Sequence, residues 1–260
     1  MQLPQIDPVF LRLGPLEFRW YGLMYIIGFV TAYFIILSGT RRKTMPLTQD
    51  DVADLIFSVA LGIILGGRFG YILFYNFSYY AAHPLKLFAV WEGGMSFHGG
   101  LTGAILAGLY FIRKKKLKFY PLADIGFLAG PVGLGLGRIG NFINGELYGR
   151  VTDVLWGIVF PAGGSLPRHP SQLYEAFLEG PVMFLLLRFL SRTNYPAGAV
   201  FWSFIGLYGL FRFIVEFFRE PDAQIGFLLG IFSMGQLLSF PMFVVGGIMV
   251  LKSYGKGGLK

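Results

Sequence analysis

Seven long apolar stretches constrain this chain more than any other feature of its sequence. They cover residues 18–38, 52–75, 96–112, 122–137, 171–190, 198–218 and 231–251. Each is near the ~20 residues that a helix needs to cross a bilayer, although the fourth is short. The sequence therefore predicts an all-α, polytopic integral membrane protein with about seven transmembrane helices. We see no internal repeat and expect a single domain over residues 1–260.

The composition agrees with a membrane protein and narrows the possible functions. Of the 260 residues, 55% are hydrophobic and only 14% are charged, whereas about 25% of a soluble domain is charged. The chain has no cysteine, which excludes a disulfide, a thiolate metal site and an enzyme thiol nucleophile. With three histidines and few acids, we expect no metal. The start of the chain lacks a basic region before an apolar core, so we expect no cleaved signal peptide.

The basic residues follow alternate apolar stretches and predict an orientation. Clusters come after the first, third, fifth and seventh stretches, at residues 41–43, 113–118, 188–192 and 252–260. Cytoplasmic loops carry such an excess of Lys and Arg. We therefore expect the N-terminus outside, the C-terminus in the cytoplasm, and the long loops 76–95 and 138–170 outside. The net charge of +8 then reflects topology and not nucleic-acid binding.

The segment from Gly133 to Arg150 is the strongest indication of a functional site. It starts as a glycine-rich apolar run and then places Arg138, Asn141, Asn144 and Glu146 close together. An arginine at membrane depth costs about 2.5–3.5 kcal/mol on insertion scales, so it usually serves a function. A guanidinium beside amides and glycines suits recognition of a phosphate or a carboxylate.

Tyr208, Arg212 and Glu216 recur every four residues in the sixth stretch, which places them on one helix face. Two interpretations stay open at this point. Arg212 and Glu216 form an ion pair that holds helices together, or Arg212 binds an anion that Glu216 orients. Tyr208 lies deeper and is able to donate a hydrogen bond.

Further candidates lie on the outer halves of other stretches. His98 stands between two glycine pairs and is either a proton acceptor or only a hydrogen-bonded anchor. Glu175 follows Pro170 and Ser171, which read as a helix start with Ser171 as the N-cap. Glu175 either favours the helix dipole or holds an arginine of the site. Arg68 and Tyr21 also belong to the outer half.

Three other classes of protein compete with an enzyme. A transporter or channel predicts polar residues in both halves of the stretches, and the inner half has no comparable density. An intramembrane serine protease needs a serine and a histidine on neighbouring helices, whereas Ser96 and His98 lie two residues apart on one segment. A purely structural lipid-binding protein would not need the face with Tyr208, Arg212 and Glu216.

Six segments resemble the bacterial phosphatidylglycerol–prolipoprotein diacylglyceryl transferases. The matching segments are Trp20–Tyr25, Leu65–Tyr71, Gly93–Gly100, Gly137–Gly149, Arg168–Glu175 and Tyr208–Arg219. The resemblance implies a seven-helix enzyme of the bacterial inner membrane with its active site toward the periplasm. Such an enzyme transfers the diacylglyceryl group of phosphatidylglycerol to the lipobox cysteine of a prolipoprotein and releases glycerol phosphate. This is the first step of lipoprotein maturation.

The resemblance implies functional roles for Tyr21, His98, Arg138, Asn141, Glu146, Gly149, Tyr208, Arg212 and Glu216, and the positions of Arg68, Asn144 and Glu175 in the sequence add these three. The expected catalytic residues are His98, Arg138, Tyr208 and Arg212. The expected substrate-binding residues are Tyr21, Arg68, Asn141, Asn144, Glu146, Gly149, Glu175 and Glu216. His98 is the candidate base for the substrate thiol, with Tyr208 and Glu216 as alternatives. We expect Arg138 and Arg212 to stabilise charge on the leaving phosphate, and Asn141 and Glu146 to hold the arginines and the headgroup in place. The expected partners are phosphatidylglycerol, prolipoprotein signal peptides with a lipobox cysteine, and membrane lipids, with no cofactor and no nucleic acid.

Overall fold

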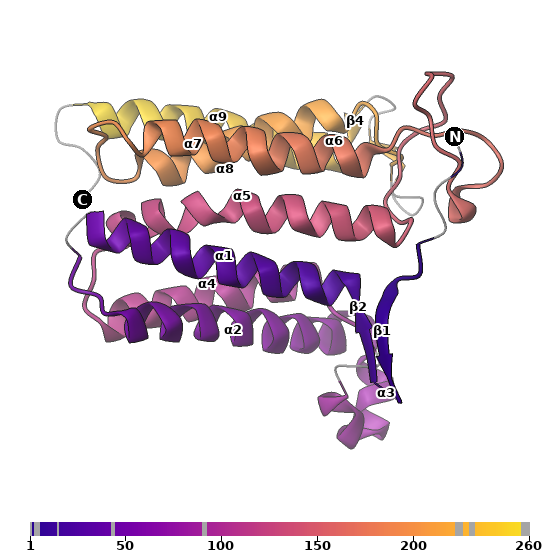
Figure 1. The fold of residues 1–260 in the computed structure, drawn as a ribbon, viewed down its shortest axis with the longest axis horizontal. Helices are drawn as coiled ribbons and strands as arrows, with labels where there is room; N and C mark the ends of the chain where they lie inside the picture. Colours follow the sequence, from indigo (N-terminus) through magenta and orange to yellow (C-terminus); the bar gives the residue numbers. More distant parts are fainter. Residues whose placement is uncertain are drawn as a thin grey trace. The chain divides into compact units, whose positions relative to one another are not determined.

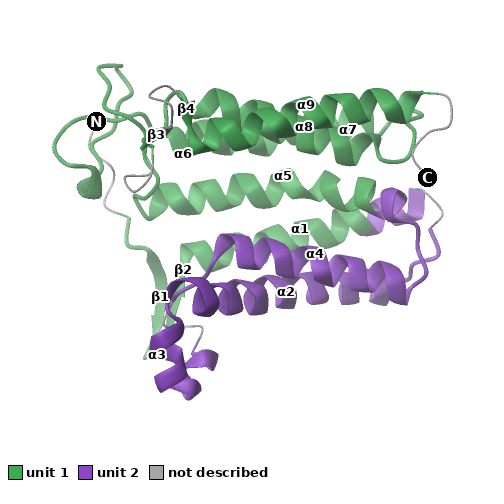
Figure 2. Ribbon diagram, turned by 180° about the vertical axis from the view of Figure 1, so that it is seen from behind, with its two compact units in different colours: residues 1–36, 123–260 green, residues 37–122 purple. Residues whose placement is uncertain are grey.

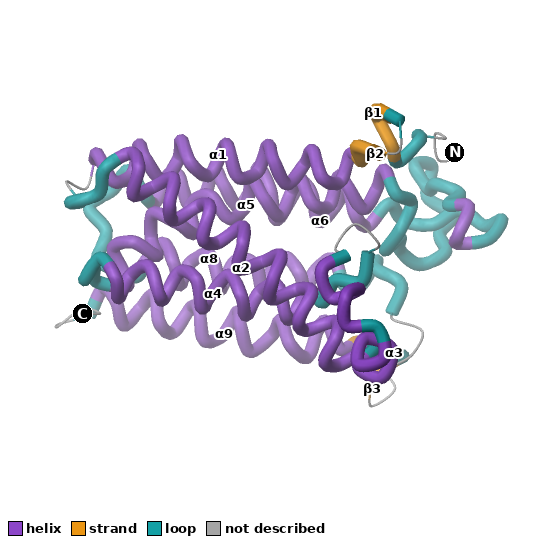
Figure 3. The backbone as a smooth tube through the Cα atoms, turned by 90° about the horizontal axis from the view of Figure 1, so that it is seen from below, coloured by secondary structure: helices purple, strands orange, loops and turns teal. Residues whose placement is uncertain are grey.

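A computed structural model describes residues 2, 6–14, 16–42, 45–89, 93–221, 226–228 and 232–255. Helices make up most of the described chain (Figure 1; Figure 3). The longer helices are α1 (Trp20–Arg42), α2 (Gln49–Tyr75), α4 (Phe97–Lys114), α5 (Phe119–Ile143), α8 (Ala199–Val215) and α9 (Met234–Tyr254). The shorter ones are α3 (Phe77–Ala82), η1 (Pro84–Phe88), η3 (Pro161–Gly163), α6 (Ser171–Phe177), η4 (Leu178–Val182) and α7 (Met183–Leu190).

A helix covers each of the seven predicted stretches. Four of the helices, α1, α2, α5 and α9, are long and apolar enough to cross a membrane, and α8 is a shorter apolar helix. The stretch predicted to be short is longer than expected, because α5 continues through the glycines as far as Ile143. The protein is therefore a helical membrane protein.

Two features of the fold depart from the predicted pattern of regular helices. The stretch 171–190 is interrupted by the π-helix η4, where Gly180 has non-helical dihedral angles and Pro181 lacks a backbone donor. Short strands also occur outside the helices. β1 (Val9–Leu13) pairs antiparallel with β2 (Leu16–Arg19), and β3 (Phe227–Leu228) pairs with β4 (Phe232–Ser233).

Hydrogen-bonded polar side chains cap the N-termini of α2 and α9. The Thr48 hydroxyl accepts a hydrogen bond from the Asp51 backbone N–H at 3.1 Å, and the Asp51 carboxylate accepts one from the Thr48 N–H at 2.9 Å. Ser233 and Gln236 form the same reciprocal capping box at the start of α9. These caps satisfy backbone donors that a helix end leaves unpaired.

Large apolar side chains remain exposed along the long helices. Phe57 of α2 is 69% exposed, Phe34 of α1 is 61% exposed, and Phe240 of α9 is 56% exposed. So many large apolar side chains with such exposure are unusual for a protein in water. It is the expected surface of helices that face lipid tails.

The described chain forms two compact units, residues 37–122 and residues 1–36 with 123–260 (Figure 2). In the unit of residues 37–122, which is unit 2 in Figure 2, α4 runs along α2. Lys115, which follows α4, forms an ion pair with Asp51 in the first turn of α2, and this carboxylate raises the pKa of Lys115. The end of α4 and the start of α2 therefore lie together. That the whole chain is one catalytic domain stays a prediction.

Glycines let the backbones of α2 and α4 touch. Gly62, Gly66 and Gly70 recur every four residues on α2, and they face Gly99 and Gly103 of α4. A Cβ added to Gly66 would lie 2.9 Å from the Gly103 Cα, and one added to Gly70 would lie 2.9 Å from the Gly99 Cα. Small residues at such spacing are a common means of close helix packing in membranes.

The unit of residues 1–36 and 123–260, which is unit 1 in Figure 2, has an apolar core in which α8 is anchored by a buried acid. The core contains Leu128, Met183, Leu187, Tyr195, Ala199, Val200 and Phe211. Asp124 of α5 accepts hydrogen bonds from the Gly198 N–H at 2.8 Å and the Phe201 N–H at 2.9 Å. A carboxylate at the start of a helix satisfies unpaired donors and opposes the helix dipole. In the same unit α9 lies along α8 (Figure 1).

The glycine contact leads to a matched pair of substitutions. Gly103→Ala places a methyl group against the backbone of α2, which should lower the midpoint of thermal unfolding in detergent. Gly108→Ala is the control, because Gly108 lies on the same helix with no atom within 4 Å of an added Cβ. Overpacking costs about 1–3 kcal/mol, whereas Ala for Gly in an open helical position is favourable by about 1 kcal/mol. Equal midpoints for the two variants would contradict the packing described.

Candidate active site

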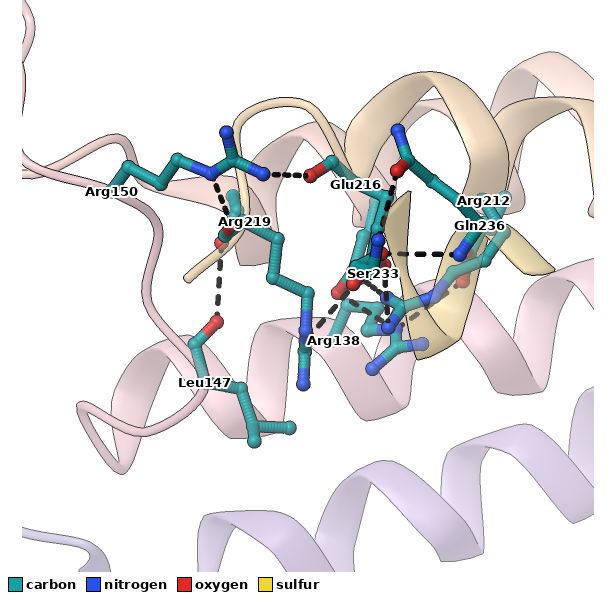
Figure 4. Close-up of polar contacts among 11 residues, drawn as sticks. Arg138, Leu147, Arg150, Arg212, Glu216, Arg219, Ser233 and Gln236 are labelled. Carbon is teal, nitrogen blue, oxygen red and sulfur yellow. Dashed lines mark hydrogen bonds and ion pairs between the residues drawn. The ribbon is translucent and has the colours of Figure 1, made fainter. Parts of the chain in front are cut away.

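The carboxylate of Glu175 on α6 lies among three arginines of the same unit. Its Oε2 is 3.1 Å from Arg138 Nε, its Oε1 is 3.4 Å from Arg219 Nη1, and Oε1 also pairs closely with Arg212 Nη1. The Glu175 side chain is fully buried. Of the two interpretations of Glu175, the one in which it holds an arginine is confirmed. It holds three, Arg138, Arg212 and Arg219, which are labelled in Figure 4.

Arg138 of α5 is held through one side of its guanidinium. Its Nε lies 3.1 Å from Glu175 Oε2 and 3.2 Å from Oε2 of Glu179, an equally buried acid in η4. Neither Nη atom has a hydrogen-bond or ion-pair partner within the part of the chain that the structure describes. A guanidinium presents paired donors to a phosphate or carboxylate through such atoms. Arg138 is thus fixed through Nε, and the N–H donors of its two Nη atoms are not used by the described residues.

Arg212 and Glu216 form the predicted ion pair on one face of α8. Arg212 Nη2 lies 2.9 Å from Glu216 Oε2. The carboxylate of Glu216 lies against Gly235 in the first turn of α9, where an added Cβ would come within 2.5 Å of it. The start of a helix favours a negative charge. Both Nη atoms of Arg212 have carboxylate partners, so the ion-pair interpretation describes the structure.

The cluster contains three arginines and three glutamates, Arg138, Arg212, Arg219, Glu175, Glu179 and Glu216. With every group ionised its formal charge is zero. Burying a charge without a partner is far more costly than burying a balanced set. Balance therefore explains how so many ionisable groups are accommodated in a membrane protein.

The loop after α5 is ordered by amide side chains. Asn141 and Asn144 donate to Glu146 Oε1 at 2.8 and 3.3 Å. Gln172 Nε2 donates to the Glu146 backbone oxygen at 2.6 Å, and Glu146 itself contacts no arginine among the described residues. The two asparagines and Glu146 therefore shape the loop beside Arg138 instead of holding the arginine directly.

Ser171 is not the N-cap that the sequence predicted. Pro170 occupies that position, and the Ser171 hydroxyl donates to the Leu147 oxygen at 3.1 Å. Leu147 has a φ of +59°, which is unfavourable for a residue with a side chain. Ser171 thus helps to hold a strained loop position. Its hydroxyl makes this contact and does not cap α6.

Gly149 lies where the loop meets the segment after α8. Its N–H donates to the His169 oxygen at 2.8 Å, and it bridges antiparallel to Arg219. Arg150 donates through Nε to the Arg219 oxygen at 2.9 Å and through Nη2 to the Glu216 oxygen at 3.1 Å (Figure 4). The crossing leaves no room for a Cβ at Gly149, because backbone atoms of Phe218 and His169 already fill that space.

The two tyrosines predicted for the site lie in the same unit as the cluster. Tyr21 of α1 packs its ring against Gly140 of α5, where an added Cβ would lie 2.5 Å from Cδ2. Tyr208 of α8 stacks on Phe204 with ring centroids 6.4 Å apart and lies within electrostatic reach of Glu179. Both are positioned by ring packing and are partly buried.

His98 and Arg68 belong to the other unit. The His98 side chain is exposed at the start of α4, next to the Phe97 ring. Arg68 is buried, and its guanidinium donates to the backbone oxygens of Leu87 at 3.1 Å, Lys86 at 2.6 Å and Gly93 at 2.5 Å. This geometry makes Arg68 an organiser of the loop that leads to His98. A direct contact of Arg68 with substrate stays a prediction.

An apolar cavity of about 490 Å³ lies beside α6 and α8. It is lined by Val154, Trp156, His169, Leu173, Tyr174, Phe177, Leu178, Ile214, Val215 and Phe218. Trp156 Nε1 donates to the Tyr174 hydroxyl at 2.7 Å. The same hydroxyl lies 3.1 Å from His169 Nδ1. Burial lowers the pKa of His169, so its neutral form is favoured beside this apolar space.

Glu179 and Arg219 were not among the predicted site residues. Glu179 follows Glu175 by four residues, the spacing that places two side chains on one helix face, so this acid pair was a usable signal. Arg219 lies beyond the end of α8, but its N–H still donates to the Val215 oxygen at 3.1 Å, so the helical course continues to this residue. Arg219 follows Arg212 by seven residues, or two helical turns, and both reach Glu175. This spacing was a usable signal as well.

The fold and the cluster define a class of protein, a helical membrane protein with a buried arginine–glutamate site. Comparison with known proteins then gives the family. Residues 8–252 match the family model described as prolipoprotein diacylglyceryl transferase. The chain belongs to this family and is therefore a transferase.

Individual relatives are similar over nearly their whole length. The phosphatidylglycerol–prolipoprotein diacylglyceryl transferase of Geobacter sulfurreducens is 72% identical over 251 residues, which cover 96% of each chain. Those of Photobacterium profundum and Vibrio cholerae are each 52% identical. The alignments cover 98% and 99% of this chain and 96% and 95% of the respective relatives.

Proposed function

We propose that the protein transfers the diacylglyceryl group of phosphatidylglycerol to the lipobox cysteine of prolipoproteins. The thiol sulfur forms a thioether with the glyceryl carbon, the carbon–oxygen bond to phosphate breaks, and glycerol phosphate leaves. Family membership over residues 8–252 supports the reaction class. The nucleophile belongs to the substrate, which agrees with a chain that has no cysteine.

The observation that carries the proposal is the way Arg138 is held. Two buried carboxylates fix its Nε, while neither Nη atom has a partner among the described residues. The leaving phosphate gains negative charge as the carbon–oxygen bond breaks. A fixed guanidinium in a poorly hydrated site stabilises such charge without reorganising. Arg212 and Tyr208 complete the proposed catalytic set in this unit, and Arg212 acts mainly by holding Glu175 and Glu216.

His98 is the proposed proton acceptor for the substrate thiol. A free thiol has a pKa near 8.5 and reacts as the thiolate, so a neighbouring base accelerates the attack. The flanking glycines let a substrate approach the imidazole. Tyr21, Arg68, Asn141, Asn144, Glu146, Gly149, Glu175 and Glu216 are proposed to shape or line the substrate site.

The first test measures the mass of a lipobox peptide after incubation with phosphatidylglycerol and purified protein. We expect a gain of one diacylglyceryl group, and none with a Cys→Ser peptide. Arg138→Ala should lower the rate by about 100- to 1000-fold, the usual effect of removing one charge-stabilising donor. Arg19→Ala is the control, because Arg19 is an exposed residue of the β1–β2 hairpin. A folded wild-type protein without activity would favour the alternative, a lipid or anion transporter.

The role of His98 has its own test. His98→Gln keeps a polar side chain, but the glutamine amide does not titrate and cannot accept the proton. The rate should therefore fall by about 100-fold or more. The acidic limb of the rate–pH profile should disappear as well. Near-normal turnover with an unchanged pH profile would remove His98 as the base.

We also propose seven membrane spans, with the N-terminus and the active site on the periplasmic side of the inner membrane and the C-terminus in the cytoplasm. The alternating basic clusters support this orientation. The Lys115–Asp51 ion pair places the end of α4 and the start of α2 together, which agrees with the antiparallel course of these two spans.

A chain without cysteine allows single-cysteine variants to test the topology. Ser78 and Thr193 are both exposed and are predicted to lie on opposite sides. In spheroplasts, a membrane-impermeant maleimide should label Ser78→Cys directly, and Thr193→Cys only after permeabilisation. The reverse pattern, or labelling of both variants in sealed spheroplasts, would contradict the orientation.

A further inference from the structure

The charge balance of the cluster creates a problem for a protein that binds a phosphate diester. Three arginines and three glutamates sum to zero when all are ionised. A bound phosphodiester adds one negative charge to a buried site. An uncompensated buried charge is strongly unfavourable. A carboxyl group of the cluster that carries a proton would restore the balance.

Two of the three carboxylates have arginine nitrogens that they do not share. Glu175 contacts three arginines, and among the described residues it alone pairs with Arg212 Nη1 and Arg219 Nη1. Glu216 has Arg212 Nη2 at 2.9 Å and lies at the first turn of α9 beside Gly235.

Glu179 is the least satisfied acid of the cluster. Among the described residues it pairs only with Arg138, whose Nε lies 3.2 Å away and also contacts Glu175. One buried oxygen of each acid lacks a hydrogen-bond partner in the described part of the chain. For Glu175 and Glu216 that oxygen still lies within 3.1 and 2.9 Å of an arginine nitrogen, whereas Glu179 Oε1 has no such neighbour there. The other titratable or charged groups that face it are Glu175 on α6 and Tyr208 and Arg212 on α8. A carboxyl with one shared partner and one bare oxygen is the natural place for a proton.

The irregular turn of η4 brings Glu179 to this position. Gly180 has φ −93° and ψ −106°, and Pro181 follows it. Gly180 lies against Gly135 of α5, where an added Cβ would be 3.2 Å from the Gly135 Cα. Gly135 precedes Arg138 by one helical turn. The two backbones therefore meet where Arg138 and Glu179 meet, which keeps this contact close.

We propose that Glu179 is a positioning residue that carries a proton when the phosphate of the lipid is bound. In the empty site its carboxylate holds Arg138 through Nε. In the occupied site the protonated carboxyl keeps the cluster and the phosphate neutral together, while Arg138 still has Glu175 at Nε and presents its Nη atoms to the phosphate. This inference rests on the proposed function, since it takes phosphatidylglycerol as the ligand.

The test is calorimetric binding of dioctanoyl phosphatidylglycerol to the full-length protein in detergent, between pH 5.5 and pH 9. Titrations in two buffers with different ionisation enthalpies give the number of protons taken up. We expect uptake to rise toward one proton per lipid as the pH increases, and affinity to fall by up to about tenfold per pH unit in the same range. Glu179→Gln resembles the protonated acid, so it should bind the lipid with little pH dependence and no linked proton.

Three controls separate the possible causes. Glu220→Gln makes the same change at an exposed ion pair with Arg168 and should behave as wild type. Dioctanoylglycerol has the same tails without phosphate and should bind without proton uptake. Glycerophosphoglycerol is the headgroup phosphodiester without tails and, unlike a phosphate monoester with its second pKa of about 6, it does not titrate in this range. Proton uptake on binding it would assign the effect to a phosphodiester without tails and overturn the lipid as the ligand.

Two results would overturn the inference about Glu179. One is lipid binding by the wild-type protein without proton uptake at any pH. This result needs no variant, so it tests the inference even if Glu179→Gln does not fold. The other is unchanged uptake in a folded Glu179→Gln protein. Failure of the proposed function is distinguishable from both, because it appears as no lipid binding and no mass gain on the lipobox peptide.

Discussion

The contact of Glu175 with three arginines is the interaction on which the rest of the site depends. It joins α5 and α8 to the segment after α8 through one fully buried carboxylate. Removing the carboxylate would leave three guanidinium groups without their shared partner, a change that commonly costs about 3–5 kcal/mol for a buried pair. The cluster thus links the helices and fixes Arg138, whose Nη atoms have no partner among the described residues.

The need to hold the site in shape explains why it contains more arginines than the reaction itself requires. Arg212 has a carboxylate at each Nη atom, and Arg150 is bonded to backbone oxygens of Arg219 and Glu216. These residues hold the shape of the site. Arg138 alone combines a fixed Nε with two Nη atoms that have no partner in the described chain. A phosphate diester, which offers paired acceptors, complements such a group.

Much of the fold could be predicted from the sequence, because hydrophobic length and basic clusters report directly on the membrane. Helix spacing likewise indicated the ion pair between Arg212 and Glu216 as one of two interpretations. The link from Glu175 to an arginine was also one of two interpretations, and helix spacing played no part in it. The kink at Gly180 could not be predicted, since it depends on the close approach of Gly135 from another helix. The carbonyl partners of Arg68 were equally hidden, because they lie 18 to 26 residues further along the chain. Local patterns do not carry such long-range contacts.

The central claim is that Arg138 contacts the phosphate of bound phosphatidylglycerol through its Nη atoms. Solid-state NMR measures this directly, as dephasing of the lipid ³¹P signal by ¹⁵N in arginine Nη positions. We predict dephasing that corresponds to hydrogen-bond distance in the wild-type protein and its loss in Arg138→Lys with lipid still bound. Bound lipid whose ³¹P signal is not dephased, or is dephased equally in Arg138→Lys, would contradict the account.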